Sequence, residues 1–163
     1  MNKQEMYAFL KTKEIPHEIT EHPAVMNMED LGMVELPYPE AVAKNLFLRD
    51  DKRKQYYLIT VKGEKRVNLK EFRKTYGTKP LTFASAEEME AILQVAPGSV
   101  TPLALLNGGA QDVIFYLDEA FYDDPVRIGC HPNENTASVW LDPKDLVRLI
   151  EEKGIAVNIV PLG

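Results

Sequence analysis

Lys44 stands at the start of an apolar stretch, residues 44–49, whose residue types are those of a β-strand. Side chains alternate along a strand, so Lys44 would share one face with Leu46 and Leu48, whereas Asn45 would point to the other. Burial on an apolar face disfavours an ammonium unless it has an anionic or carbonyl partner. Lys44 is therefore a candidate for binding a substrate. The alternative is a lysine at a strand end whose ammonium reaches water.

The uncharged stretch SVTPLALLN, residues 99–107, is a second candidate and follows Gly98. Thr101 before Pro102 has the residue types of a helix N-cap and first helical position, which predicts a helical turn over 103–106. Backbone amides just before such a turn can bind a carbonyl oxygen or a phosphate, and a glycine lets a ligand approach the backbone closely. The alternative is a plain junction between a loop and a helix.

A third candidate is the stretch GCHPNENTASVWL, in which His131 is held extended by Pro132 and precedes a polar run, 133–136. Polar side chains at the mouth of a strand suit ligand binding, although a lone histidine is more often structural and such runs often form turns. Cys130 lies next to His131, but adjacent side chains of an extended chain point apart. A Cys-His hydrolase is therefore disfavoured.

The composition limits the class of protein. A chain of 163 residues, 45% of them hydrophobic, fits one compact domain. The sequence contains no apolar run long enough for a membrane span and no secretory signal at its start, so we expect a cytoplasmic protein with no membrane partner. One cysteine excludes an internal disulfide framework, and three scattered histidines give no zinc-ligand spacing. We expect neither a metal nor another cofactor.

The charge is unevenly distributed along the chain. The formal net charge is -6, yet residues 44–79 contain twelve of the nineteen Lys and Arg and only four acids. A local basic surface on an acidic body can bind a polyanion while the remainder of the protein discourages non-specific association. The alternative is a set of ordinary solvated side chains on a helix and on hairpin tips.

The elements that must position these residues alternate in type. Residues 2–13 have helical spacing, and Ser85 with Glu88, like Asn68 with Glu71, has the spacing of a capping box. We expect helices at 2–13, 69–75, 86–94 and from 143 to Gly154, strands at 17–21, 112–117, 126–130, 136–141 and 156–160, and a β-meander with basic tips over 44–69. The expected fold class is α/β, a single domain with a mixed, mostly antiparallel sheet and flanking helices.

These stretches together resemble the YbaK/ProX family of trans-editing aminoacyl-tRNA deacylases, which also occurs as the insertion editing domain of bacterial prolyl-tRNA synthetases. The resemblance spans nearly the whole chain. It rests on EHPAV (21–25), AKNLFLRD (43–50), YYLITV (56–61), LTFAS (81–85), PGSVTPLALLN (97–107) and HPNENTASVWL (131–141). The motifs KNLFL and PGSVTP are most similar to those of the ProX branch, which acts on alanyl-tRNA(Pro).

The resemblance implies a site as well as a fold. The essential lysine of the family falls on Lys44 and its neighbouring asparagine on Asn45, which makes these two the catalytic candidates. The substrate-binding candidates are Gly98, Ser99, Val100, Thr101, Pro102, His131, Asn135 and Thr136. The implied reaction is hydrolysis of the ester between alanine and the 3′ adenosine of tRNA(Pro), with water activated by the substrate's own ribose hydroxyl.

The implied partner is the aminoacylated acceptor end of tRNA(Pro), and prolyl-tRNA synthetase is a further candidate partner. Three alternatives stay open at this point. The chain could be a non-catalytic module that binds or reports on aminoacyl-tRNA, a deacylase for cysteine or serine esters, or a generic ligand-binding α/β domain. The basic segment suits each of the first two equally, so charge alone does not separate them.

Overall fold

The computed structural model describes residues 1–52 and 55–163, so Arg53 and Lys54 of the expected basic hairpin tip lie outside the described residues. The strands are β1 (His17–Glu21), β2 (Ala43–Asp50), β3 (Tyr56–Lys62), β4 (Leu81–Phe83), β5 (Val113–Asp118), β6 (Ile128–Cys130), β7 (Ala137–Leu141) and β8 (Val157–Val160). The helices are α1 (Lys3–Thr12), α2 (Met28–Leu31), α3 (Leu69–Tyr76), α4 (Ala86–Glu88) and α5 (Pro143–Glu152). Short turns of other helical types are η1 (Pro39–Ala41), η2 (Met89–Leu93), η3 (Pro97–Ser99), η4 (Pro102–Asn107) and η5 (Glu119–Tyr122).

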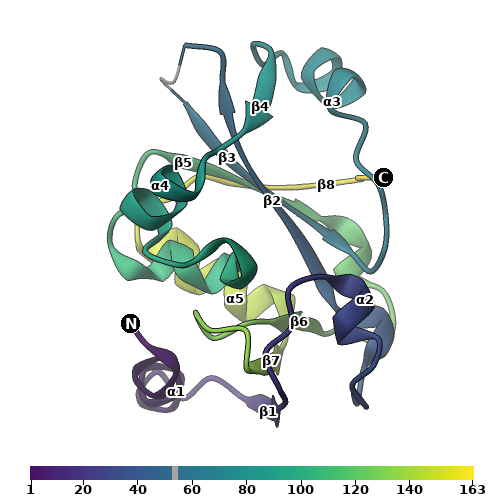
Figure 1. The fold of residues 1–163 in the computed structure, drawn as a ribbon, viewed down its shortest axis with the longest axis vertical. Helices are drawn as coiled ribbons and strands as arrows, with labels where there is room; N and C mark the ends of the chain where they lie inside the picture. Colours follow the sequence, from purple (N-terminus) through teal and green to yellow (C-terminus); the bar gives the residue numbers. More distant parts are fainter. Residues whose placement is uncertain (53–54) are drawn as a thin grey trace.

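The strands form two sheets (Figure 1). The larger has the order β4-β2-β3-β5-β8, with antiparallel pairing around β2 and parallel pairing around β5. The smaller has the order β1-β7-β6 and is antiparallel throughout. The expected mixture of pairings with an antiparallel majority is therefore confirmed. The strands are divided between two sheets, because β7 pairs with the distant β1 and with β6. Local sequence patterns do not determine which strands pair.

The hairpin of β2 and β3 forms as predicted, but its continuation into a meander is wrong. Gly63 adopts a positive φ of 66° after β3, which suits the expected tight turn. Beyond this turn the chain leaves the sheet, because both edges of β3 are already occupied, one by β2 and the other by β5. Residues 64–68 lead instead to α3, whose N-cap Asn68 accepts hydrogen bonds from the amides of Lys70 and Glu71.

The other helices begin where the caps predict. Ser85 and Glu88 form the full reciprocal capping box of α4, and the chain continues as the π-type turn η2. Asp142 caps α5, which has Pro143 at its first turn. Five of the described elements have no counterpart in the expectations: the short helix α2, the short edge strand β4, and the turns η1, η3 and η5. None of the helices among the described residues has the length and apolar character that a membrane crossing requires.

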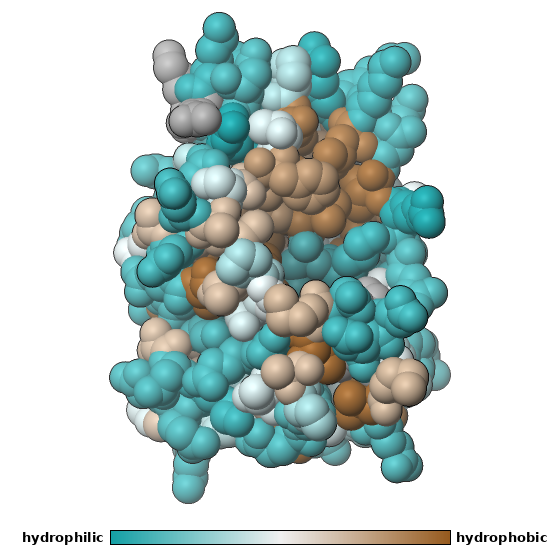
Figure 2. Space-filling model, in the orientation of Figure 1, coloured by the Kyte–Doolittle hydropathy of each residue, from teal (hydrophilic) through white to brown (hydrophobic). Residues whose placement is uncertain are grey.

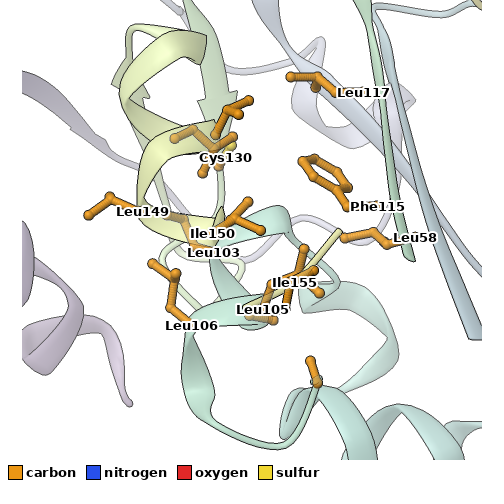
Figure 3. Packing of buried hydrophobic residues seen from close by; sticks show 14 of the residues in the cluster. Leu58, Leu103, Leu105, Leu106, Phe115, Leu117, Cys130, Leu149, Ile150 and Ile155 are labelled. Atoms are coloured by element: carbon orange, nitrogen blue, oxygen red, sulfur yellow. The ribbon is translucent and has the colours of Figure 1, made fainter. Parts of the chain in front are cut away.

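The main core lies between the two sheets and joins them. Figure 3 shows Leu58, Phe115 and Leu117 of the larger sheet, Cys130 of the smaller one, and leucines of η4 and α5 in one cluster. The leucines of SVTPLALLN are thus core residues, and Leu103 and Leu105 are almost completely buried. This burial fixes the loop before η4 relative to both sheets, so the backbone around Gly98 is held by packing.

A second cluster lies on the opposite face of the larger sheet, where α3 covers it. Phe72 of α3 is buried there and packs edge-on against Tyr116 at 4.8 Å. The space-filling view in Figure 2 shows a mostly hydrophilic surface with an apolar area over the strands of the larger sheet. Leu46 and Leu48 belong to this second cluster, whereas Phe47 belongs to the main core, so the side chains of β2 alternate between the two faces as predicted.

Candidate active site

A cavity of about 470 Å³ opens at the start of β2. Four parts of the chain surround it: the beginning of β2, the loop at η3, the segment from Val25 into α2, and His131 just after β6. The lining residues are Val25, Met26, Asn27, Glu29, Ala43, Lys44, Asn45, Pro97, Gly98, Val100 and His131. The candidates Lys44, Asn45, Gly98, Val100 and His131, which are far apart in the sequence, therefore meet at one cavity.

Asn45 connects β2 to the loop. Its Nδ2 donates to the carbonyl of Val100 at 3.2 Å, and its Oδ1 accepts a hydrogen bond from Thr60 Oγ1 at 2.7 Å. Thr60 is completely buried on β3. Both ends of the Asn45 amide are thereby fixed, and the loop is held at a set distance from the strand.

Lys44 leaves the strand on the other face. Its Nζ donates to the backbone carbonyl of Lys65 at 3.3 Å, and its side chain is half-buried. Because the cavity lies at the first residues of β2, side chains from both faces of the strand reach it, and both Lys44 and Asn45 line it. Within the described residues of this lining, Lys44 is the one cation, and its partner is a neutral carbonyl. The positive charge is therefore not cancelled by an ion pair.

At Gly98, two walls of the cavity lie close together. A Cβ atom at this position would lie 2.8 Å from Cε and 3.0 Å from Sδ of Met26, and 3.3 Å from Nδ2 of Asn135. Asn135 in turn donates to the carbonyl of Val25 at 2.7 Å, and the Met26 amide donates to Asp30 at 3.1 Å. A Cβ at this position would displace the flexible end of Met26, so glycine allows the thioether to rest against the loop.

The remaining loop candidates are buried and do not line the cavity. Ser99, Thr101 and Pro102 are all less than one-tenth exposed, and the Ser99 amide donates to the carbonyl of Ala96. Thr101 is the N-cap of η4, as expected, and accepts a hydrogen bond from the amide of Leu103. These three side chains anchor the loop, and a direct contact with substrate would have to come from their backbone.

Cys130 is buried behind this loop. Burial raises the pKa of its thiol well above the ordinary value, and a hydrogen bond with Thr101 opposes this shift without cancelling it. A thiol that stays protonated is a poor nucleophile. The structure thus supports the argument against a Cys-His hydrolase.

His131 lines the cavity as a neutral imidazole. Its Nδ1 donates to the carbonyl of Ala137 at 2.9 Å, so the lone pair is at Nε2. Desolvation lowers the pKa of His131 below its ordinary value, and the nearby His22 adds to this effect. The two rings lie 6.2 Å apart, edge to face. Nε2 of His131 is therefore suited to accept a hydrogen bond from a substrate or a water.

Thr136 lies elsewhere. Its Oγ1 accepts a hydrogen bond from Lys3 Nζ at 3.1 Å, and Lys3 also pairs with Glu21 at 2.9 Å. This contact ties α1 to the smaller sheet, away from the residues that line the cavity. Conversely, Met26, Asn27 and Glu29 line the cavity although sequence reasoning assigned them no role. In the sequence, the one indication of a role for these residues is that they directly follow EHPAV, a stretch on which the family resemblance rests.

The described residues include no group of three or more His, Cys, Asp or Glu side chains that could hold a metal ion. The polar side chains that line the cavity supply an ammonium, two carboxamides, a carboxylate and an imidazole, beside backbone groups. Such a set can orient a polar substrate and stabilise negative charge that develops on a carbonyl oxygen.

Comparison with known proteins shows which family has this sequence. The family model described as the aminoacyl-tRNA editing domain matches residues 22–149. The prolyl-tRNA editing protein ProX of Acetoanaerobium sticklandii is 29% identical over 98% of this chain and 97% of its own length. The prolyl-tRNA synthetase associated domain-containing protein 1 of Bos taurus is 36% identical over 84% of this chain and 81% of its own length.

The fold is also found among solved structures. A crystal structure described as a candidate trans-editing enzyme for prolyl-tRNA synthetase superposes with a TM-score of 0.71 over 99% of this chain and 97% of that chain, at 23% identity. The match of the family model includes β2, the Gly98 loop and His131. The chain therefore belongs to the family of aminoacyl-tRNA editing domains, and its activity is hydrolytic editing of aminoacyl-tRNA.

Proposed function

We propose that the protein removes alanine from mischarged tRNA(Pro) by hydrolysing the ester at the 3′ adenosine. The observation that carries this proposal is the cavity at which Lys44, Asn45, Gly98 and His131 meet. Two of the similar proteins described above have prolyl-tRNA in their names. The motifs KNLFL and PGSVTP also resemble those of the branch that acts on alanyl-tRNA(Pro). The same proposal implies a cytoplasmic protein, since tRNA is aminoacylated there.

The proposed mechanism uses water as the nucleophile. The lining has no serine, threonine or cysteine side chain among its described residues. The ribose hydroxyl next to the ester would help activate the water, and the enzyme would supply orientation. Lys44 would stabilise the negative charge that develops on the ester carbonyl, and Asn45 would keep the Gly98 loop in place to bind the adenosine end. Nε2 of His131 would accept a hydrogen bond from the α-ammonium group of the substrate.

Selection would follow from the size of the aminoacyl group. A synthetase site built for proline cannot strongly reject alanine, because a missing methylene changes binding by about 1–3 kcal/mol. A second, smaller site can exclude proline by steric hindrance. The Met26 thioether, which lies against Gly98, is the side chain proposed to supply this restriction.

Measurement of deacylation tests the substrate assignment. Purified protein should remove alanine from alanyl-tRNA(Pro) more than about 200-fold faster than it removes proline from prolyl-tRNA(Pro), because an editing site must discriminate more strongly than the roughly tenfold to 200-fold of a single synthetase site. Cysteinyl- and seryl-tRNA(Pro) belong in the same series. Faster turnover of one of these esters would keep the chemistry and replace alanine. Binding without turnover of any ester would favour the non-catalytic module.

The exposed face of α3 supports tRNA as the polyanion that the basic segment binds. Phe72 faces the sheet, so Lys70, Arg73 and Lys74 are exposed on the other side of the helix. Arg66 and Lys79, on either side of α3, are exposed as well. This face is suited to contact the phosphates of the acceptor stem while the 3′ end enters the cavity.

Removal of this charge should weaken tRNA binding and its dependence on salt. In a variant with Lys70, Arg73 and Lys74 all replaced by Ala, the slope of log K against log[salt] should become less negative by up to about 3, or roughly 0.9 for each lost contact with a duplex phosphate. Filter binding from 50 to 300 mM salt measures the slope. The matched control replaces exposed Lys11, Lys13 and Lys153. Equal slopes for both triple variants would contradict docking on α3 and indicate that tRNA contacts another surface.

Prolyl-tRNA synthetase is proposed as a second partner on the strength of the name of the Bos taurus relative alone. Co-sedimentation of the two proteins, with and without tRNA(Pro), tests the proposal. Independent sedimentation under both conditions would remove the synthetase as a partner.

A further inference from the structure

A buried carboxylate lies behind the turn that receives Lys44. Asp118, the last residue of β5, is completely buried. Its Oδ2 accepts hydrogen bonds from the Lys62 amide at 3.1 Å and from Lys65 Nζ at 2.8 Å, and its Oδ1 accepts one from the Ala120 amide at 3.0 Å. One side chain thus holds the end of β3, the turn after it and the start of η5. A buried charge with this many donors is well satisfied.

Lys65 is the link between this carboxylate and Lys44. Its ammonium bridges Asp118 and the carbonyl of Leu162, the latter at 3.1 Å, and its aliphatic stem lies against Gly163. Its own backbone carbonyl accepts the hydrogen bond from Lys44 Nζ. The amide of Gly63 donates to the carbonyl of Val42 at 2.7 Å, which fastens the same turn to the residue just before β2. The acceptor for Lys44 is therefore part of a rigid structure.

This arrangement keeps the Lys44 ammonium from forming an ion pair with the Asp118 carboxylate. Asp118 forms its ion pair with Lys65, and Lys44 receives a neutral carbonyl in place of a carboxylate. A carbonyl orients an ammonium without cancelling its charge, so the charge stays available to a developing oxyanion. A lysine has four rotatable side-chain bonds, and a fixed acceptor reduces the freedom that would otherwise be lost on binding substrate.

We propose that Asp118 and Lys65 are positioning residues for Lys44: the Asp118–Lys65 ion pair fixes the carbonyl that orients the Lys44 ammonium at the cavity. The proposal rests on the function proposed above, in which Lys44 stabilises the reacting ester. Asp118 and Lys65 touch no substrate atom in this scheme. They act through the turn, and their loss should reduce turnover more than binding.

Two substitutions test this positioning role. Asp118→Asn keeps the size of the side chain but replaces one of its two acceptor oxygens with a donor, so it cannot accept from the Lys62 amide, the Lys65 ammonium and the Ala120 amide together. Lys65→Met keeps the aliphatic stem and removes the ion pair. It leaves the buried Asp118 carboxylate with its backbone amide donors alone, so a lower melting temperature is expected for this variant. Each should lower kcat for alanyl-tRNA(Pro) by about tenfold or more, because a displacement of about 1 Å can cost up to 100-fold, while KM changes less than about threefold. Lys65→Arg, which keeps the cation, should restore most of the turnover.

A second readout does not depend on catalysis. In protein labelled with ¹³C at lysine, the Lys44 Cε resonance, assigned with Lys44→Arg, should shift in Asp118→Asn and in Lys65→Met. The matched control is Lys13→Met, which removes the exposed ion pair with Glu152 at 3.5 Å and should change neither kcat nor the Lys44 resonance. Wild-type kcat in folded Asp118→Asn and Lys65→Met, or an unmoved Lys44 resonance, would overturn the proposal.

The two readouts keep this inference separate from the proposed function. If the wild-type protein hydrolyses none of the esters, the proposed function fails, yet the shift of the Lys44 resonance still reports whether the Asp118–Lys65 pair orients it. If Asp118→Asn does not fold, Lys65→Met and its rescue by Lys65→Arg decide the question alone. A drop in melting temperature with unchanged kcat would show a purely structural role.

Discussion

Lys44→Ala should lower the deacylation rate of alanyl-tRNA(Pro) by at least about 100-fold, the loss typical when one group that stabilises an oxyanion is removed. Among the described residues that line the cavity, Lys44 is the one cation, and its ammonium is held by a single neutral carbonyl. Nothing else in the described lining can replace its positive charge. Single-turnover deacylation with enzyme in excess separates this loss from weaker binding.

The fold should survive the Lys44→Ala substitution, because a half-buried side chain with one hydrogen bond to a carbonyl contributes about 1 kcal/mol to stability. The melting temperature should therefore stay within a few degrees of the wild-type value. Lys13→Ala serves as the matched lysine control and should keep wild-type turnover. Lys44→Arg keeps the charge but not its geometry, so an intermediate rate is expected. A wild-type rate for Lys44→Ala would refute the assigned role.

The largest expected effect on stability comes from Gly129→Ala. Gly129 faces Trp140 across the β6–β7 pairing, and a Cβ atom at this glycine would lie 2.4 Å from Cζ3 of the indole. The indole cannot easily move, because it is completely buried and its Nε1 donates to Thr20 Oγ1 at 3.0 Å. Overpacking of this kind costs about 2–3 kcal/mol, and for a chain of this size that lowers the melting temperature by roughly 5–10 °C.

A double-mutant cycle identifies the steric cause of this destabilisation. Trp140→Phe removes the part of the indole that a new Cβ would strike, so Gly129→Ala should cost much less in that background than in the wild type. Thermal and urea unfolding, each with circular dichroism, supply the four stabilities. Equal costs in both backgrounds would place the strain at Gly129 itself and contradict the clash with Trp140.

The local elements were largely predictable because their signals are local. The capping box at Ser85 and the proline after Asp142 state where helices begin, and the alternation of Lys44 to Arg49 gave the two faces of β2 correctly. The division into two sheets was not predictable in this way. It depends on which distant strands meet, and the partner of β7 is β1, more than one hundred residues earlier in the chain. The meander failed for a similar reason, since the occupancy of the edge of β3 by β5 is a long-range fact.

The site was predictable to the extent that residue types and motif order determine it. Lys44, Asn45, Gly98, Val100 and His131 meet at the cavity. Thr101 and Pro102 share the motif but are turned into the core, because a cap and a first helical residue serve the backbone of η4. Thr136 was grouped with His131 by proximity in sequence, yet it contacts Lys3. The wall formed by Met26 depends on how the chain folds back over Gly98, which no local pattern specifies.

The two walls at Gly98 differ in how much the fold depends on them. One is the loop anchored by the buried Ser99, Thr101 and Pro102, and the other ends in the thioether of Met26, which is 66% exposed. Substitutions at exposed positions usually change stability by less than about 0.5 kcal/mol, whereas changes in a packed core cost several times more. Under the proposed function, the acyl preference can therefore change from the Met26 side at little cost in stability, whereas a change on the anchored loop side would also destabilise the fold.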